Sequence, residues 1–244
     1  MFLDKKYVGR VNKKLAQKMS HYLENNDWEY VADFLYKKET DTGFIEYVGS
    51  ANLHIDRSFM ISLNVQNKKI NAYMVRFFGK ESKKVIFLDK KLFRLDGTLD
   101  SINDMAAMIF EILVDRLESF FAWSRPNYSI EKMYELDMLE RQGHKHDKEF
   151  QVFIGGGGPS SRMTRMLIYN EISDEAYAQA YKEAVEFFVR AQYNWLSDKE
   201  KFASDDISNY FFEASSGIKK VIDLHYMLRP KEYAKLLESK PDSL

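Results

Sequence analysis

Cysteine is absent from this chain of 244 residues, and proline and glycine are scarce. Without Cys there is no disulfide, no thiolate nucleophile and no Cys-containing zinc or iron–sulfur site, and the composition suits a reducing compartment. The 4 Pro and 11 Gly residues compare with the roughly 12 and 17 that average usage gives. We therefore expect long regular elements with few tight turns.

Long apolar runs are missing as well. No stretch approaches the roughly 18 apolar residues that span a bilayer, and residues 1–9 lack the apolar core of a signal peptide. We therefore expect no membrane partner and a cytoplasmic, intracellular location, which for a viral product means the host cytoplasm or the virion. Hydrophobic residues still form 45% of the chain and aromatic residues 15%, which is enough for a packed core.

The net charge of −1 conceals two halves of opposite sign. Residues 1–100 carry a net charge of +5 and residues 101–244 carry −6. The basic residues of the first half gather near the N-terminus and again between residues 68 and 94, where they can contact phosphates or an acidic protein. The candidates for contact with nucleic acid or an acidic partner are Lys13, Lys14, Lys68, Lys69, Arg76, Lys80, Lys83 and Lys84.

Hydrophobic periodicity in the first hundred residues changes from helical to alternating. Apolar residues at helical steps predict a basic amphipathic helix over 7–22 and a second helix over 28–38. Alternation over 59–65 predicts a strand with one buried face. Further strands are predicted at 44–48, 70–78 and 84–88, and short polar hairpin loops around the last two give an antiparallel meander.

The next segment predicts helices that cover this meander. Asp100 or Ser101 caps a wide apolar stripe over 102–121, and Ser129 opens a shorter helix that ends at Gly143. The polar stretch that follows suggests two parts, 1–143 and 144–244, although one continuous domain remains open.

The second part combines a predicted hairpin with helices. Strands at 150–154 and 163–169 flank a glycine-rich loop, and everything from Ser173 onward has a helical pattern. The predicted class is α+β: N-terminal helices and a meander under a long helix, then a β-hairpin and a mainly helical C-terminal part.

The glycine-rich loop is the most unusual motif. Four consecutive glycines leave backbone N–H groups open, and the following hydroxyls and arginines suit an anion. The Walker pattern fails because no Lys-Ser or Lys-Thr follows the last glycine, and the dinucleotide fingerprint lacks its third glycine. The leading interpretation is a flexible hairpin tip or a place where another backbone approaches closely. The residues of the alternative phosphate site are Gly156, Gly157, Ser160, Ser161, Arg162 and Arg165.

No catalytic constellation emerges from the sequence. His144 and His146 lie near Asp147, but no distant third ligand can be named, so we expect no metal. The remaining histidines are isolated, and no Ser/His/Asp arrangement can be singled out. We therefore predict no catalytic residue and no cofactor, and we favour a protein that is not an enzyme.

Three functions remain, in a definite order. The leading hypothesis is a non-enzymatic assembly or interaction protein that binds another protein or copies of itself. Its specific form is a viral (phage) or mobile-element structural component. The chain is rich in Lys, Ile, Asn, Phe and Tyr, which A/T-rich codons specify, and viruses and mobile elements often have A/T-rich genomes. The alternatives are a nucleic-acid-binding accessory protein that uses the basic N-terminal half, and a phosphate- or nucleotide-handling enzyme built on the loop from Gly155 to Arg162.

Overall fold

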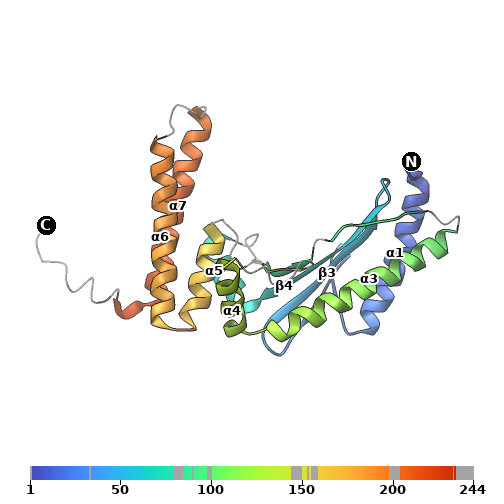
Figure 1. Cartoon of the computed structure of the whole chain (residues 1–244), viewed down its shortest axis with the longest axis horizontal. Helices are drawn as coiled ribbons and strands as arrows, with labels where there is room; N and C mark the ends of the chain where they lie inside the picture. Colours follow the sequence, from blue (N-terminus) through green and yellow to red (C-terminus); the bar gives the residue numbers. More distant parts are fainter. Residues whose placement is uncertain are drawn as a thin grey trace, which may run out of the picture. The chain divides into compact units, whose positions relative to one another are not determined.

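The computed structural model of the chain contains two compact units (Figure 1). Unit 1 comprises Met1–Tyr73 and Lys83–Phe153, and unit 2 comprises Met74–Ser82 and Ile154–Leu244. The α+β class is confirmed, whereas the domain boundary after residue 143 stays a prediction. The structure describes residues 2–32, 34–79, 85–89, 91–97, 101–143, 150–152, 154, 159–197, 204–232 and 234.

Unit 1 is built on a seven-stranded sheet in which all neighbouring strands are antiparallel. Its strand order is β1-β2-β3-β4-β5-β7, and β6 pairs with β4. The strands are β1 (Glu29–Ala32), β2 (Leu35–Glu39), β3 (Phe44–Leu53), β4 (Ser58–Asn67), β5 (Val85–Asp89), β6 (Phe93–Arg94) and β7 (Gln151–Val152).

Two long helices cover one face of this sheet. α1 (Lys5–Asn25) packs on β3, and α3 (Ile102–Ser124) packs on β4 and along α1 (Figure 1). Residues 44–48 of β3 and 59–67 of β4 alternate between buried and half-buried because successive side chains point to opposite faces of a strand. The predicted helices at 7–22 and 102–121 and the predicted strands at 44–48, 59–65 and 84–88 are thereby confirmed.

The predicted caps of the two central helices are also confirmed. The Ser101 side chain accepts a hydrogen bond from the backbone N–H of Asp104 at the start of α3. Ser129 does the same for Lys132 at the start of α4 (Ile130–Arg141), which follows a short 3-10 turn (Arg125–Asn127). Gly143 lies just beyond α4 with φ +82°, a conformation that suits glycine.

Unit 2 is helical in its described part. It contains the end of α2 (Lys68–Phe78) and the helices α5 (Pro159–Asn170), α6 (Asp174–Ser197) and α7 (Ser204–Leu228). α6 packs against both α5 and α7 around a core that includes Met166, Phe188 and Leu224. Across the described residues, no helix is both long enough and apolar enough to cross a membrane.

The helix predicted over 28–38 is wrong, because this segment forms the β1–β2 hairpin. Its apolar residues do not share one buried face: Tyr30, Val31 and Phe34 are exposed, and only Trp28 and Tyr36 are buried. Tyr30 of β1 lies opposite Tyr36 of β2, and their rings are in contact. The aromatic residues therefore meet across two strands instead of lining one face of a helix.

The strand predicted over 70–78, and the hairpin loop before it, are also wrong. β4 runs directly into α2, and the side chain of Asn67 caps this helix by accepting from the backbone N–H of Ile70 at 3.0 Å. Ile70 and Met74 are both buried, one helical turn apart, so an apolar run of this length also fits a helix face.

The hairpin predicted in the second half does not form, because a helix takes the place of its second strand. The predicted strand at 150–154 contains only β7, which pairs with β5. The predicted strand at 163–169 belongs to α5, which begins at Pro159, a residue that suits the first helical turn. Met163 and every residue from 164 to 169 are buried, and a segment buried all round has no periodicity that separates helix from strand.

Candidate functional site

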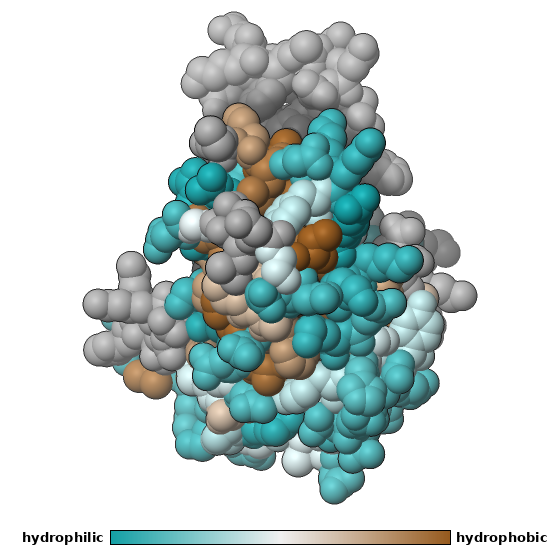
Figure 2. Space-filling view, turned by 90° about the vertical axis from the view of Figure 1, so that its right-hand side faces the viewer, coloured by the Kyte–Doolittle hydropathy of each residue, from teal (hydrophilic) through white to brown (hydrophobic). Residues whose placement is uncertain are grey.

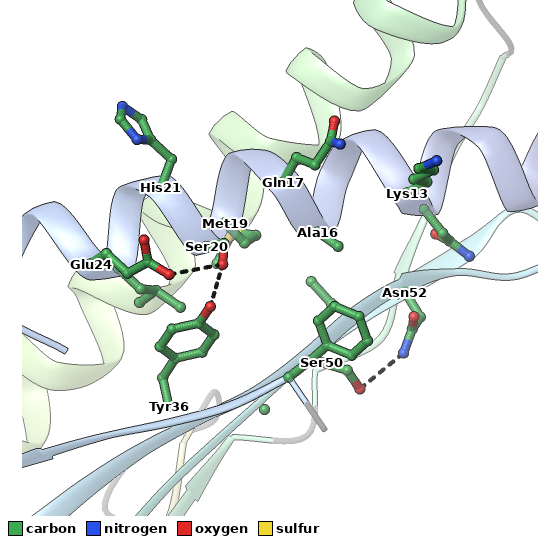
Figure 3. A pocket seen from close by; sticks show the side chains of 15 residues that line it. Lys13, Ala16, Gln17, Met19, Ser20, His21, Glu24, Tyr36, Ser50 and Asn52 are labelled. Carbon is green, nitrogen blue, oxygen red and sulfur yellow. Dashed lines mark hydrogen bonds between the residues drawn. The ribbon is translucent and has the colours of Figure 1, made fainter. Parts of the chain in front are cut away.

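A groove of about 630 Å³ lies in unit 1 between α1 and the strands β2 and β3. One wall consists of residues 12–24 of α1, and the other contains Phe34, Tyr36 and the segment 49–52 of β3. Figure 3 shows Tyr36 pointing up to α1 at one end, and Ser50 and Asn52 below the helix at the other. The name α1 groove is used for this pocket below.

The floor of the α1 groove, formed by buried side chains at the base of its α1 wall, is apolar, and some of the polar groups in the groove are paired with each other. Met19 and Leu23 are buried members of the core that also line the groove. The hydroxyls of Ser20 and Tyr36 are hydrogen-bonded to each other, and Ser20 Oγ donates to Glu24 Oε1 at 3.3 Å (Figure 3). This arrangement holds α1 to β2 and leaves apolar surface for a ligand.

Phe34 stands out among the lining residues. Its side chain is 56% exposed, and its backbone has φ +60° in the two-residue turn between Ala32 and Leu35. Tight hairpin turns with such dihedrals favour glycine or asparagine, and a bulky residue there is strained. Phe34 therefore contributes little to the core and disfavours its own turn, a combination that points to a role in binding.

Replacing Phe34 with glycine should make the protein more stable than replacing it with alanine, by about 1 kcal/mol. Both variants lose the exposed ring, but only glycine removes the cost of a left-handed backbone, which is about 1–2 kcal/mol before glycine's greater unfolded-state entropy is subtracted. Chemical unfolding in urea measures the difference. Equal stability of the two variants would show that the turn carries no strain.

The two ends of the α1 groove differ in charge. Lys13 lies at the end near Asn52, and Glu24 lies at the end near Tyr36 (Figure 3). Lys6, Arg10 and Lys13 are spaced by four and three residues, so they share one helix face, and all three are exposed. None of these three takes part in an ion pair within the described part of the chain. This basic helix face extends from the Lys13 end of the groove toward the start of α1.

Hydrophobic side chains reach the surface between hydrophilic ones in the view toward α1 and α3 (Figure 2). Unit 1 also exposes large hydrophobic side chains that do not line the α1 groove. Phe2, Ile55 and Leu92 are exposed, and the backbone N–H of Leu3 donates to the carbonyl of Ile55 at 2.8 Å. These residues do not line the α1 groove, and Leu92 serves below as a control position.

The structure separates the predicted basic candidates. Lys13 and Lys14 are exposed on α1, but only Lys13 lines the α1 groove. Lys68 and Lys69 begin α2 rather than a hairpin loop, and Lys68 Nζ lies 2.5 Å from Glu39 Oε2. Arg76 is exposed near the end of α2. The remaining candidates Lys80, Lys83 and Lys84 lie outside the described residues.

The residues of the predicted phosphate loop have mixed outcomes. Ser161 and Arg165 are buried within α5, and the guanidinium of Arg162 lies over the ring of Phe187, with its Cζ 5.0 Å from the ring centroid. Gly156, Gly157, the side chain of Ser160, and the histidines His144 and His146 lie outside what the structure describes. Phosphate binding at this loop stays a prediction.

Unit 2 contains a polar pocket of about 420 Å³, lined by residues of α6, of α7 and of the segment that follows α7. Tyr177 Oη lies 2.8 Å from His225 Nδ1, and His225 Nε2 lies 3.3 Å from Glu232 Oε2. Burial lowers the pKa of His225 and raises the pKa of Tyr177, so both groups stay uncharged near neutral pH. The phenol of Tyr177 and the imidazole of His225, which also stacks on the ring of Tyr181, are hydrogen-bonded to each other and hold α6 and α7 together.

Comparison with models of protein families, with curated proteins and with solved structures finds no match to this chain. The α1 groove therefore stands on its own geometry. Sequence patterns identify one of its features, the basic α1, but miss Phe34 and Tyr36 because the spacing predicts a helix where the hairpin that carries them forms.

Proposed function

We propose that this chain is a non-enzymatic interaction protein whose α1 groove binds a segment of a partner protein. The observation that carries the proposal is Phe34, an exposed aromatic side chain held in an unfavourable turn at the wall of the groove. Aromatic side chains are the typical anchors of protein interfaces because they bury a large area and have few rotatable bonds.

The charges around the groove specify the chemistry of the partner segment. Lys13, with Lys6 and Arg10 on the same helix face, favours acidic groups at the end near Asn52. The apolar floor formed by Met19 and Leu23 favours an apolar residue between that end and Phe34. The expected partner is therefore a protein segment that carries an apolar anchor next to carboxylates.

Selection of random peptides displayed on phage against the full chain tests this proposal. We expect the selected peptides to be enriched in an apolar residue next to Asp or Glu. In fluorescence polarization with a selected peptide, Phe34→Ala should weaken binding about tenfold or more, because an anchor of an interface contributes at least about 1.4 kcal/mol. Lys13→Glu should weaken binding more at low salt than at high salt, because salt screens the attraction between Lys13 and the carboxylates of the peptide.

Matched controls are available on the same unit. Leu92→Ala removes an equally exposed apolar side chain outside the α1 groove, and Lys14→Glu reverses a charge on α1 that does not line it. Both should bind the peptide nearly as the unmodified chain does. Failure to select peptides, or equal losses in test and control variants, would contradict the proposal. Light scattering on the chain alone reports whether the partner is a second copy, through a mass that is a multiple of 28.8 kDa.

Nucleic acid is the second candidate, and the observation in its favour is the charge of α1. Residues 5–18 contain six basic side chains and no acidic one, all six exposed. Contact with phosphates depends on the number of charges rather than on the groove. If a single-stranded oligonucleotide binds with steep salt dependence, and Lys14→Glu weakens it as much as Lys13→Glu, this function replaces protein binding.

A further inference from the structure

The α1 groove lies at a gap in the pairing of β3. β2 pairs with β3 from Glu39 with Ile45 to Tyr36 with Val48, and the left-handed turn at Phe34 then carries the chain away. β4 continues to pair on the other side as far as Leu53 with Phe59. Within the described residues, no strand pairs with positions 49–53 of β3 on the side of β2.

One end of this gap is closed by a side chain that imitates a strand. Asn12 Oδ1 accepts from the backbone N–H of Leu53 at 2.8 Å, and Asn12 Nδ2 donates to the carbonyl of Leu53 at 3.0 Å. These are the two hydrogen bonds that a residue of a neighbouring antiparallel strand would exchange with Leu53. Leu53 therefore directs its backbone groups away from β4 and toward the gap.

Ala51 presents the same backbone groups without such a partner. The irregularity in the β3–β4 register lies between Val48 and Ala51, so pairing from Ala51 to Leu53 is regular. In a regular antiparallel strand, residues two apart direct N–H and C=O to the same side. The N–H and C=O of Ala51 thus face the gap, and no hydrogen bond from another described strand meets them there.

We propose that the partner segment binds as an added strand on β3, between the end of β2 and Asn12. This inference rests on the proposed function and specifies its mode, with main-chain bonds to Ala51 and alternate side chains directed into the α1 groove. The segment is extended, places an apolar residue beneath α1 near Phe34, and places a carboxylate beside Lys13. A helix in the groove would use the apolar floor but leave the edge of β3 unpaired.

Backbone methylation of a selected peptide tests strand pairing directly. Each peptide N–H is replaced in turn by N–CH₃, which removes one donor and blocks one edge of a strand. In polarization assays with the full chain, methylation at alternate positions should weaken binding about tenfold or more, and methylation between them should leave the affinity nearly unchanged. The absence of alternation would overturn the proposal.

Amide hydrogen exchange of the full chain supplies a second readout. The Ala51 amide should exchange rapidly in the free protein and slow at least tenfold when the peptide is added. The Leu53 amide, already bonded to Asn12, is the internal reference and should change little. If peptides bind in a manner that depends on Phe34 while Ala51 stays unprotected, strand addition fails and the proposed function stands. If no peptide depends on Phe34, both fail.

Discussion

Replacing Arg116 with methionine should lower the free energy of unfolding by about 3–5 kcal/mol, because the substitution leaves the carboxylate of Asp89 buried without its cation. Arg116 of α3 meets Asp89 at the end of β5 through two hydrogen bonds, Nε to Oδ2 at 2.6 Å and Nη2 to Oδ1 at 2.9 Å. The two side chains are only 5% and 1% exposed. Urea unfolding followed by circular dichroism measures the loss.

The double variant Arg116→Met with Asp89→Leu distinguishes a broken ion pair from lost packing. Removing both partners leaves neither charge of this pair buried without the other, so most of the lost stability should return. Part of it will not, because Asp89 also accepts from the backbone N–H of Lys91 and Arg116 also lies over the ring of Phe150. If the double variant is less stable than the single one, desolvated charge is not the cause.

An exposed ion pair in the same unit provides the control. Lys132 and Glu135 of α4 are 51% and 56% exposed, and their Nζ and Oε2 atoms lie 2.6 Å apart. Lys132→Met should cost at most about 1 kcal/mol, because water screens the charges and the side chains lose entropy when they pair. If Lys132→Met and Arg116→Met lowered the free energy of unfolding by similar amounts, burial of the ion pair would not explain the effect at Arg116.

Elements with one clearly buried stripe are predictable from this sequence. In α3, Met105, Ile109 and Leu113 recur every four residues over a long helix, and Ser101 marks its start. Strand β4 is equally clear, because its buried residues alternate from Phe59 to its end at Asn67. In both elements local spacing and tertiary burial agree, so the pattern alone identifies them.

Short apolar segments are not predictable in the same way. The run from Ile70 to Phe78 fits a strand as well as a helix, and a single side-chain cap from Asn67 accompanies the helix that forms. The hairpin of β1 and β2 depends on pairing with β3 and on the contact of Tyr36 with Ser20. These contacts join residues of different segments, and the spacing of apolar residues within one segment does not contain them.

The candidate site is harder to predict than the fold. The basic face of α1, including Lys13, follows from residue types and helical spacing. The α1 groove depends instead on a backbone angle at Phe34 and on Asn12 meeting Leu53, 41 positions later in the chain. An aromatic residue in place of the usual glycine at a tight turn is a signal only after the turn is known.

Replacing Gly217 with alanine should destabilise unit 2 by about 1–3 kcal/mol, the usual cost of overpacking a close-packed core. Gly217 lies in α7 where it crosses α6, and a Cβ at this position would lie 2.6 Å from Cδ1 and 2.7 Å from Cζ of Phe188. Phe188 is itself buried, so its ring has no free space to enter. The midpoint of thermal or urea unfolding measures the effect.

The same substitution at Gly9 should have the opposite sign. Gly9 lies in α1, and a Cβ at this position would meet no neighbouring atom within 4 Å, so alanine there should raise stability by up to about 1 kcal/mol through helix propensity alone. Gly217→Ala combined with Phe188→Leu should cost less than the sum of the two single changes, because the smaller side chain makes room for the methyl group. Strictly additive costs would mean that the helices separate instead of clashing at this crossing, and that Gly217 is not what allows α6 and α7 to approach.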